Sequence, residues 1–311
     1  MSEHKRKTSR GESTRTWQIA SQQYVLGRFP WIMGIVNVTP DSFSDGGRFL
    51  DADAAVRHAL DLAADGAEIL DIGGESTRPG AGRVGDAEQI ARVVPVVRAI
   101  RGELGEIPIS VDTTRSVVAA AAIDHGADAI NDVSGATEDA GMLELAARTE
   151  AGVVLMHRLV EPERDSYSDQ YASPPRYADV VVEIRSSLQA RAEAALEAGV
   201  RRDRIVLDPG LGFGKTVEQN MELVRRSGEL ASLGYPLLCA ASRKSFVGAV
   251  SIGAGSSPSD RLAGSIAMSV VQRMLGASIF REHDALEQSQ ALRVVAALER
   301  AGGFSRSGAR A

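Results

Sequence analysis

Four polar side chains end or follow short apolar runs at separate places in this sequence. Asp112, Asn131 and Asp208 each end such a run, and Lys244 follows another. Helix capping explains these residues poorly, because each would lie partly buried at the mouth of the fold. An unpaired buried charge is costly, so such groups need partners. The pattern predicts a polar heterocyclic ligand that satisfies all four groups together.

Cationic side chains near the last apolar run indicate that the ligand carries phosphate. Arg281 and His283 alternate across Glu282, so at the end of an extended strand they face the same way. Both can donate hydrogen bonds to phosphate oxygens, and Arg78 is a third cationic candidate. A Mg²⁺ ion held by Asn37 together with phosphates would leave no stronger signature in a sequence.

The sequence lacks the common nucleotide-binding motifs and a zinc-binding pattern. The segment from Gly210 to Thr216 is not a Walker A loop, because Pro209 stands where the first glycine is needed, and Lys215 replaces the last glycine of a dinucleotide-binding motif. Three of the remaining histidines fall in the tail or in helical stretches, so no zinc-ligand cluster is visible. Three further aspartates fit helix or turn capping better than ligand binding; these are Asp41, Asp132 and Asp284.

The elements that must position these groups follow from one repeated pattern. A short apolar run is followed by a polar or Gly-rich turn and then by an amphipathic stretch rich in Ala and Leu. The eight apolar runs span residues 32–38, 67–72, 107–111, 127–131, 153–157, 204–207, 236–241 and 277–280. The clearest helical stretches span residues 52–64, 87–101, 116–124 and 176–198, several with a glycine just beyond the end. Eight such units predict an α/β fold, a single (β/α)₈ TIM barrel with the site at the carboxyl ends of its strands, while a doubly wound open sheet is the alternative.

The ends of the chain differ in composition from the repeating part. Residues 1–28 are polar with mixed charges and are expected to form a flexible N-terminal extension, since their acidic residues argue against an organelle-targeting peptide. The barrel is expected over residues 29–301, and residues 302–311 are expected to form a flexible tail. The connection over residues 158–175 is unusually long, which is typical of a functional loop.

Composition narrows the class of protein. The 311 residues are 44% hydrophobic, and their formal charge of -6 gives no reason to expect nucleic acid as a partner. Cys239 is the single cysteine and lies in an apolar run, so a buried thiol in a reducing cytoplasm is expected. No stretch approaches the ~20 apolar residues of a membrane helix, and the N-terminus lacks the apolar core of a signal peptide.

Several ordered motifs together resemble dihydropteroate synthase, a family of pterin-binding barrels. The likeness covers about residues 30–300 in register, and motifs of this length in this order rarely coincide by chance. The motifs are Met33 to Gly47 (MGIVNVTPDSFSDGG), Asp71 to Gly80 (DIGGESTRPG), Asp208-Pro209-Gly210, Ser242 to Ser245 (SRKS) and Arg281 to Asp284 (REHD).

The resemblance implies a reaction and a role for each motif residue. Dihydropteroate synthases condense 6-hydroxymethyl-7,8-dihydropterin diphosphate with p-aminobenzoate, releasing pyrophosphate, in folate biosynthesis. The residues implied for the pterin are Asp112, Asn131, Met156, Asp208, Phe213 and Lys244; for the diphosphate, Asn37, Thr77, Arg78, Arg281 and His283; and for p-aminobenzoate, Thr77, Arg78, Pro79 and Ser242. Those implied for catalysis are Asp112, Asp208, Lys244, Arg281 and His283, with Mg²⁺ on Asn37. Inhibition by sulfonamides, which imitate p-aminobenzoate, and a homodimer to which residues 265–275 contribute are also implied.

The sequence departs from the family pattern at three places. Arg158-Leu159-Val160 stands where relatives usually carry Met-Gln-Gly, Ala240 replaces a usual Gly, and Leu211 stands where some relatives have Phe. The first change alters the fifth loop, the Ala240 methyl could crowd the pterin pocket, and Leu211 could loosen the aminobenzoate pocket. The rival readings are a catalytically silent pterin-binding paralogue and a methyltetrahydrofolate:corrinoid methyltransferase-like barrel. The second rival would not need the Ser76 to Pro79 loop or the Arg281/His283 pair.

Overall fold

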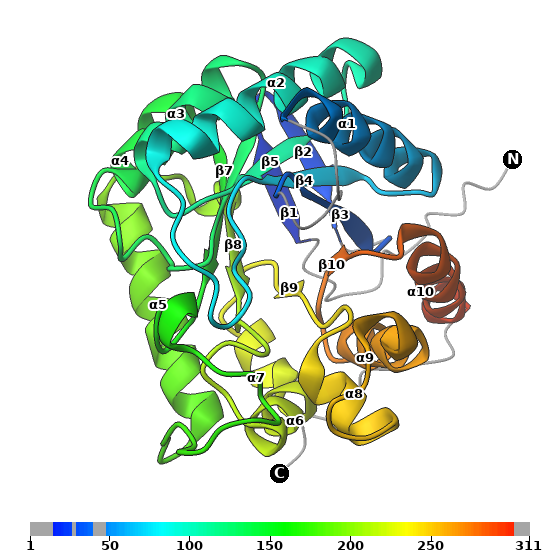
Figure 1. The fold of residues 1–311 in the computed structure, drawn as a ribbon. Coiled ribbons are helices and arrows are strands. Elements are labelled where there is room, and N and C mark those ends of the chain that lie inside the picture. The colour runs from blue at the N-terminus through cyan, green and yellow to red at the C-terminus, as the bar shows by residue number, and fades with distance from the viewer. Residues whose placement is uncertain (1–14, 27–28, 40–47, 302–311) are drawn as a thin grey trace, which may run out of the picture.

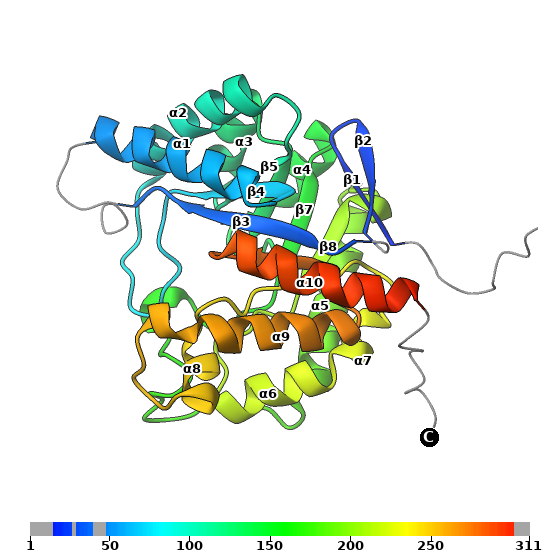
Figure 2. The ribbon, with the colours of Figure 1, turned by 90° about the vertical axis from the view of Figure 1, so that its right-hand side faces the viewer.

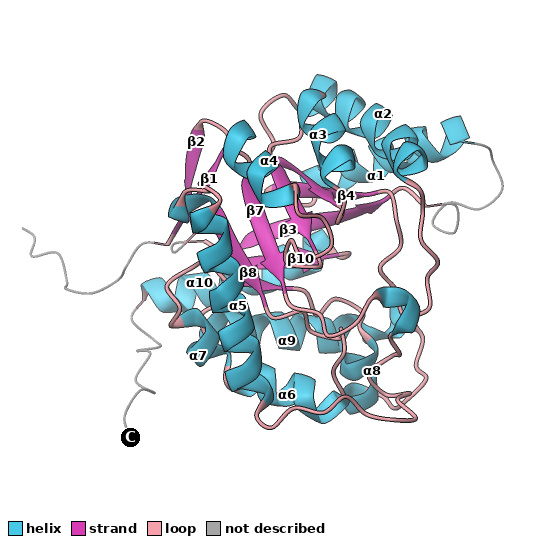
Figure 3. Cartoon of the chain, turned by 90° about the vertical axis from the view of Figure 1, so that its left-hand side faces the viewer, coloured by secondary structure: helices cyan, strands magenta, loops and turns pink. Residues whose placement is uncertain are grey.

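Eight parallel strands form the centre of the molecule, and helices surround them (Figures 1 and 3). The computed structural model describes residues 15–26, 29–39 and 48–301. The strands are β3 (Trp31–Asn37), β4 (Ile69–Gly73), β5 (Ile109–Asp112), β6 (Ala129–Asp132), β7 (Gly152–Met156), β8 (Ile205–Asp208), β9 (Leu238–Cys239) and β10 (Ile279–Glu282). Each of the eight apolar runs of the sequence overlaps one of them, which confirms the predicted repeat.

The strand order is that of a barrel rather than of an open doubly wound sheet. Neighbours in the sheet follow the order β8-β7-β6-β5-β4-β3-β10-β9, and each pair is parallel. The two edge strands meet at a parallel bridge between Leu207 and Leu237, where the Leu207 amide donates to the Pro236 carbonyl over 3.0 Å. The single (β/α)₈ barrel predicted from the sequence is therefore confirmed.

The helices lie where the amphipathic stretches predict them, with shifted ends. The predicted helix over 116–124 is α3, and the one over 176–198 begins later, at Val180, where the Asp179 carboxylate caps the first turn. The helices are α1 (Arg48–Ala64), α2 (Asp86–Leu104), α3 (Ser116–Asp124), α4 (Met142–Thr149), α5 (Val180–Glu197), α6 (Val217–Arg225), α7 (Ser227–Ala231), α8 (Ser245–Ser251), α9 (Leu262–Met274) and α10 (Ala285–Arg300). Gly66, Gly126 and Gly199 follow helix ends with φ values of 102°, 114° and 95°, as predicted for C-terminal glycines.

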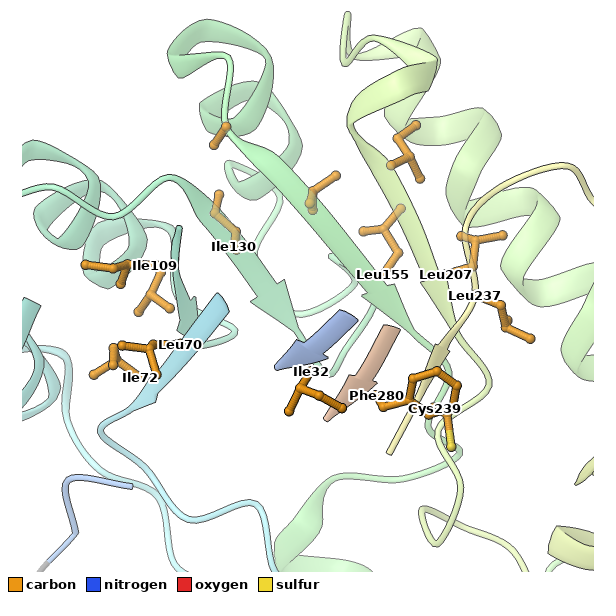
Figure 4. Close-up of a cluster of buried hydrophobic side chains, with 14 of the residues drawn as sticks. Ile32, Leu70, Ile72, Ile109, Ile130, Leu155, Leu207, Leu237, Cys239 and Phe280 are labelled. Carbon is orange, nitrogen blue, oxygen red and sulfur yellow. The ribbon is translucent and has the colours of Figure 1, made fainter. Parts of the chain in front are cut away.

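Successive strand residues divide between two apolar clusters. Side chains on the outer faces of the strands, such as Leu70, Ile130 and Leu155, pack against the helices in the main core, and Figure 4 shows part of this layer. Cys239 is fully buried in the same core, as expected for an apolar thiol. The inner faces contribute a second cluster, which includes Met33, Ile69, Val154, Val206 and Ile279. Because successive side chains of a strand point to opposite faces, every second one points inward, and these side chains fill the barrel interior near the amino ends of the strands with aliphatic groups.

An antiparallel hairpin covers the barrel end opposite the carboxyl ends of the strands (Figure 2). It consists of β1 (Thr16–Ile19) and β2 (Gln22–Val25), and Trp17, Ile19 and Leu26 are fully or almost fully buried in the inner cluster. The expectation of a flexible extension is therefore wrong for residues 16–26, because this apolar face seals the barrel floor. Residues 1–14, 27–28 and 302–311, with the rest of the expected extension and tail, lie outside the described residues.

Candidate active site

The inner face of the barrel changes from apolar to polar toward the carboxyl ends of the strands. Four residues predicted for the pterin occupy inner positions there: Asp112 on β5, Asn131 on β6, Met156 on β7 and Asp208 on β8. Their exposed fractions are 6%, 3%, 3% and 3%. Strand geometry thus brings together side chains that lie far apart in the sequence and removes them from bulk water.

A buried carboxylate on β4 links several of these groups. Asp71 Oδ2 accepts hydrogen bonds from Arg281 Nε over 2.6 Å and from Asn131 Nδ2 over 2.9 Å, and its Oδ1 accepts one from the Ser110 hydroxyl. Arg281 Nη2 also donates to Asp112 Oδ2 over 2.8 Å. Sequence reasoning missed Asp71, although a charged residue within an apolar run is a usable signal because it needs buried partners.

Burial changes the acidity of the carboxylates at this rim. It raises the pKa of Asp112 to about 7, with Arg281 opposing the rise and Asp71 adding to it. It also raises the pKa of Asp208, against the attraction of Lys244 and a hydrogen bond of 2.7 Å from the Gly210 amide. Asp112 can therefore exchange a proton near neutral pH, and both carboxyl groups can form hydrogen bonds with a polar ligand.

Lys244 and Phe213 come together beside Asp208. The Lys244 ammonium lies 4.5 Å from the centroid of the Phe213 ring and donates to the Leu211 carbonyl. Burial lowers the pKa of Lys244 to about 8, although the Asp208 carboxylate favours the charged form. The Lys244 ammonium and the Phe213 ring are therefore joined by a cation–π contact beside Asp208.

A glycine-rich loop after β8 carries these groups, and a second lysine holds it. Gly210, Gly212 and Gly214 have positive φ values of 66°, 81° and 62°, and a Cβ on Gly210 would lie 1.9 Å from the His157 carbonyl oxygen. Lys215, which is fully buried, donates to the Gly210 carbonyl over 2.8 Å and to the Phe213 carbonyl over 2.7 Å. Sequence reasoning used Lys215 only to reject a nucleotide motif and missed this role.

His157 is held neutral by its surroundings. Its Nδ1 lies 3.2 Å from the Lys215 ammonium, and burial together with that cation lowers the pKa of His157 to about 3. Burial in turn lowers the pKa of Lys215 to about 7, although Asp208 opposes the shift. The His157 ring is therefore neutral at neutral pH, and Lys215 supports the loop after β8 through its hydrogen bonds to the Gly210 and Phe213 carbonyls.

The two residues predicted to bind an anion lie close together but have different partners. Arg281 is engaged by Asp71 and Asp112, whereas His283 Nδ1 lies 2.9 Å from the Ser242 hydroxyl. Burial, followed by the charge of Arg281, lowers the pKa of His283 to about 3. If Nδ1 accepts from Ser242, the neutral ring carries its proton on Nε2 and can donate it to a phosphate oxygen.

Asn37, the predicted metal ligand, ends β3 beside Asp112. A Cβ built on Gly73 would lie 3.6 Å from Asn37 Oδ1 and 3.9 Å from Asp112 Oδ2, so both oxygens approach the same glycine. The loop that follows, residues 40–47, contains the predicted capping residue Asp41 and lies outside the described residues.

The loop after β4 brings Thr77, Arg78 and Pro79 to the same end of the barrel. Thr77 and Asp112 line one cavity, while Arg78 is exposed and its charge contributes to the lowered pKa of His283. The structure thus gathers the residues predicted for all three ligand groups at one rim.

Some expectations for individual side chains are wrong. Leu211 is fully buried in the main core, so it packs behind the loop after β8 and does not line an aminobenzoate pocket. Asp284 does not cap α10 with its side chain; its carboxylate pairs with Arg243, whose Nε lies 2.9 Å from Oδ2. Asp132 does act as predicted, because its Oδ1 accepts from the Ser134 amide over 2.7 Å. Ala240 belongs to the inner apolar cluster.

Known proteins share this fold and these motifs. A sequence family described as "Pterin binding enzyme" matches residues 33–283. The chain is 41% identical over 278 residues to the dihydropteroate synthase of Clostridium beijerinckii, covering 89% of this chain and 97% of that protein. Two solved structures are also similar, a Xanthomonas albilineans dihydropteroate synthase with 4-aminobenzoic acid (39% identity, TM-score 0.83) and a Yersinia pestis dihydropteroate synthase with a sulfonamide drug (38%, 0.83). Each alignment covers 92% of this chain and 99% of that one. The chain therefore belongs to the dihydropteroate synthase family of pterin-binding enzymes.

Proposed function

We propose that this chain condenses 6-hydroxymethyl-7,8-dihydropterin diphosphate with p-aminobenzoate to give 7,8-dihydropteroate and pyrophosphate. The observation that carries the proposal is the buried polar set at the carboxyl ends of the strands, where Asp112, Asn131 and Asp208 face the barrel interior. Similarity to dihydropteroate synthases over most of both chains supports it. In this reaction a bond forms between the arylamine nitrogen and the pterin methylene carbon, the bond from that carbon to the diphosphate oxygen breaks, and the amine loses a proton.

The pterin end of the site follows from hydrogen-bonding capacity. Asp208 and Asn131 would bond the amino and ring N–H groups of the pterin, and Lys244 would donate to its carbonyl or ring nitrogen. The Phe213 ring and Met156 would pack near the heterocycle, with Phe213 already in contact with Lys244. A ligand edge with both donors and acceptors would satisfy carboxylate, amide and ammonium groups together.

Catalysis in this arrangement is electrostatic. Positive charge grows on the pterin methylene as the diphosphate departs, and the carboxylates of Asp112 and Asp208 would stabilise it from fixed positions. Their own partners, Arg281 and the Gly210 amide, hold them in place before substrate arrives. No covalent nucleophile is required. The loop after β4 would exclude water, which would otherwise hydrolyse the developing cation.

The diphosphate is assigned to the opposite part of the rim. Arg281 and His283 would donate to its oxygens, with Asn37, Thr77 and Arg78 completing the contacts. A neutral His283 suits this role. The Ser242 hydroxyl contacts Nδ1 of the ring, so the proton on Nε2 of His283 is free to bond an anion.

The donor set also fits Mg²⁺ bound with a diphosphate. Among the described residues no three His, Cys, Asp or Glu side chains are grouped to hold a metal ion. Mg²⁺ needs only one or two protein oxygens when substrate phosphates supply others, and the Asn37 amide oxygen lies near the Asp112 carboxylate. Asn37 would hold the ion, which would offset negative charge on the leaving diphosphate.

The p-aminobenzoate end is assigned to Thr77, Arg78, Pro79 and Ser242. These residues lie on the loop after β4 and beside His283, so they would border the pterin methylene from the solvent side. The similar Yersinia pestis structure is a complex with a sulfonamide drug, and we expect sulfonamides to compete with p-aminobenzoate here as well. Steady-state inhibition at varied p-aminobenzoate would test this expectation.

The test of the activity is pyrophosphate release by the purified protein from dihydropterin diphosphate, with and without p-aminobenzoate and Mg²⁺. Release that requires both, coupled to dihydropteroate, is the expected result. Pterin binding without release would indicate a silent paralogue, and methyl transfer from methyltetrahydrofolate to a corrinoid would indicate the other rival.

A homodimer through the last helices is also proposed. Val271 and Met274 on α9 are 43% and 41% exposed, and Val294 and Leu298 on α10 are 61% and 43% exposed. These apolar side chains lie on two helices in contact and would be covered by a second copy. Light scattering during size-exclusion chromatography is expected to give twice the chain mass, and Val294→Lys should give the monomer.

In the part of the chain that the structure describes, no helix is long and apolar enough to cross a membrane.

A further inference from the structure

Two arginines from different loops share one carboxylate oxygen beside the site. Arg83, on the loop after β4, and Arg158, on the loop after β7, each donate through Nη2 to Oε1 of Glu138. Glu138 lies between β6 and α4, so a single carboxylate joins three of the loops at the carboxyl ends of the strands. We call these three residues the 83–138–158 cluster.

The cluster is shielded from water on the Arg158 side. The side chains of Arg158 and Glu138 are only 6% and 15% exposed, whereas that of Arg83 is 35% exposed. Although burial acts to raise it, hydrogen bonds from Arg83 and Thr114 and the charge of Arg158 hold the pKa of Glu138 below its usual range. A charge pair with so little solvent around it is screened less by salt than a surface pair is.

Among the described residues, Glu138 is the carboxylate that forms an ion pair with Arg158. Its Nη1 is buried and has no hydrogen-bond partner among the described residues. The charge of Arg158 also acts on Asp132, whose Oδ1 accepts from Ser134 and whose Oδ2 is buried without a hydrogen-bond partner among the described residues. Leaving this guanidinium without its carboxylate would be costly, so the Arg158–Glu138 contact is expected to persist.

Further bonds tie the same two loops together. The Arg83 amide donates to Glu163 Oε1 over 2.9 Å, and the Gly80 amide donates to the Pro162 carbonyl over 2.8 Å. Glu75 accepts from the Val84 amide over 2.6 Å and lies 3.5 Å from Arg83 Nη1. The contacts of Glu75 with Arg83 and Val84 therefore close the segment 75–84 on itself, and the bonds of Gly80 and Arg83 hold it to the loop after β7.

The cluster borders the site itself. Thr77, Asp112, Arg83 and Arg158 line one small cavity together with Pro162. Any movement of residues 75–83 would change the position of Thr77 relative to Asp112, which ends the buried strand β5. The ion pairs of Glu138 with Arg83 and Arg158 therefore connect residues 75–83 to the loops at the carboxyl ends of the strands.

We propose that Arg158 is a positioning residue: through Glu138 it holds Arg83, and with it residues 75–83, over the end of the pocket where the second substrate binds. The identity of that substrate as an aromatic amine rests on the proposed function. Arg158 touches neither reacting atom; it lowers the cost of ordering the loop that carries Thr77, Arg78 and Pro79 when p-aminobenzoate binds.

The first test needs no substrate. Hydrogen exchange of the amides of residues 76–84 would be compared in the wild type, Arg158→Met, Glu138→Gln and the double variant. We expect exchange there to quicken by about tenfold in Arg158→Met and by at least as much in Glu138→Gln, which also weakens the contact with Arg83. The double variant should match Glu138→Gln, because both single changes remove the Arg158–Glu138 contact. Arg225→Gln, which breaks the exposed ion pair with Glu222 on α6, serves as the control and should leave these amides unchanged.

The second test separates positioning from a general structural role. Each variant is expected to raise KM for p-aminobenzoate about tenfold, while kcat and KM for the pterin diphosphate change less than about twofold. Arg158→Lys, which keeps a charge near Glu138, should recover part of the loss. If Arg158→Met does not fold, the partly exposed Glu138 makes Glu138→Gln the deciding variant.

Unchanged exchange at residues 76–84 in Glu138→Gln would overturn the proposal, as would equal losses in both KM values and kcat. A wild-type protein that makes no dihydropteroate would count against the proposed function alone, since the exchange experiment reads the cluster without any substrate.

Discussion

The two ends of the barrel are built from the same strands, but the inner positions are apolar at one end and largely polar at the other. Toward the hairpin, inner positions hold Met33, Ile69 and Val154 under a fully buried Trp17. Toward the carboxyl ends, charged groups take inner positions: Asp71 follows Ile69 on β4, and Asp208 follows Val206 on β8. We call the end at the hairpin the lower half of the barrel and the end at the carboxyl ends of the strands the upper half. The lower half gains stability from the burial of apolar area, whereas the upper half contains buried charged groups that can bind a ligand.

The comparison teaches how a buried polar layer is tolerated. Each charged group at the upper end has partners of opposite sign or hydrogen bonds, as Arg281 has with Asp71 and Asp112. These contacts leave hydrogen-bonding capacity unused, which a substrate would complete. The lower half needs no ligand, so substitutions in it should affect the stability of the fold. Substitutions in the upper half should affect substrate binding.

The largest expected effect is on stability, from Trp17→Ala. The indole is fully buried, and its Nε1 donates to the Arg204 carbonyl over 2.9 Å. Its loss should lower the free energy of unfolding by about 3–5 kcal/mol, measured by urea denaturation, with kcat of the folded enzyme unchanged. Gln23→Ala, at an exposed position of the same hairpin, should cost less than about 0.5 kcal/mol. A large loss of kcat in Trp17→Ala would break the proposed division between the two ends.

The next largest effect is expected at the upper end, from Asp208→Asn and Lys244→Ala. Each should weaken pterin binding by on the order of 1–3 kcal/mol, because a charged hydrogen bond to the ligand is lost. Calorimetric titration with the pterin gives the affinity, and thermal denaturation gives the stability of the same samples. Both variants should lose less stability than Trp17→Ala. Unchanged affinity in both would refute the pocket assignment.

The sequence predicts the two ends of the barrel unequally well. Asp112, Asn131 and Asp208 could be found because they end apolar runs, and barrel topology then places all strand ends at one rim. Asp71 was missed because it lies in the middle of a strand, and its partners Arg281 and Asn131 come from strands distant in sequence. Periodicity reports which face a residue occupies, not which residues meet across the barrel.

The hairpin was missed for a related reason. Its strands have four residues each, and only Trp17, Ile19 and Leu26 are apolar and fully buried. The alternation of Trp17 and Ile19 with polar neighbours is a signal for a strand, but it extends over only four residues and is therefore weak. The Arg83–Glu138–Arg158 contacts could not be predicted at all, because surface-type residues on three loops reveal no pairing in sequence.

A third prediction concerns pH and a charge on the outer face of β10. Glu282 is fully buried, with hydrogen bonds of 2.9 Å from Ser269 and Gln288, and burial raises its pKa from 4.5 to about 8. The folded state thus binds more protons than the unfolded state between these pH values, so this group's contribution to stability falls as pH rises through that range. Glu282→Gln should gain stability relative to the wild type by on the order of 1–3 kcal/mol between pH 5 and pH 8. Denaturation midpoints at the two pH values measure this difference, and a constant difference would contradict the raised pKa.

The smallest effect is expected at Ala240, which lies where the apolar and polar halves meet. Its methyl group is almost fully buried in the inner cluster that also contains Leu238, and Asp208 begins the polar rim on the neighbouring part of the barrel. Ala240→Gly should cost about 1 kcal/mol of stability, because it removes a buried methyl and adds freedom to the unfolded chain. If the methyl also crowds the pterin, KM for the pterin diphosphate should fall by up to about threefold. A loss of stability with unchanged KM would show that the Ala240 methyl group contributes only to packing in the lower half. A fall in KM would show that the same methyl group also affects binding in the upper half.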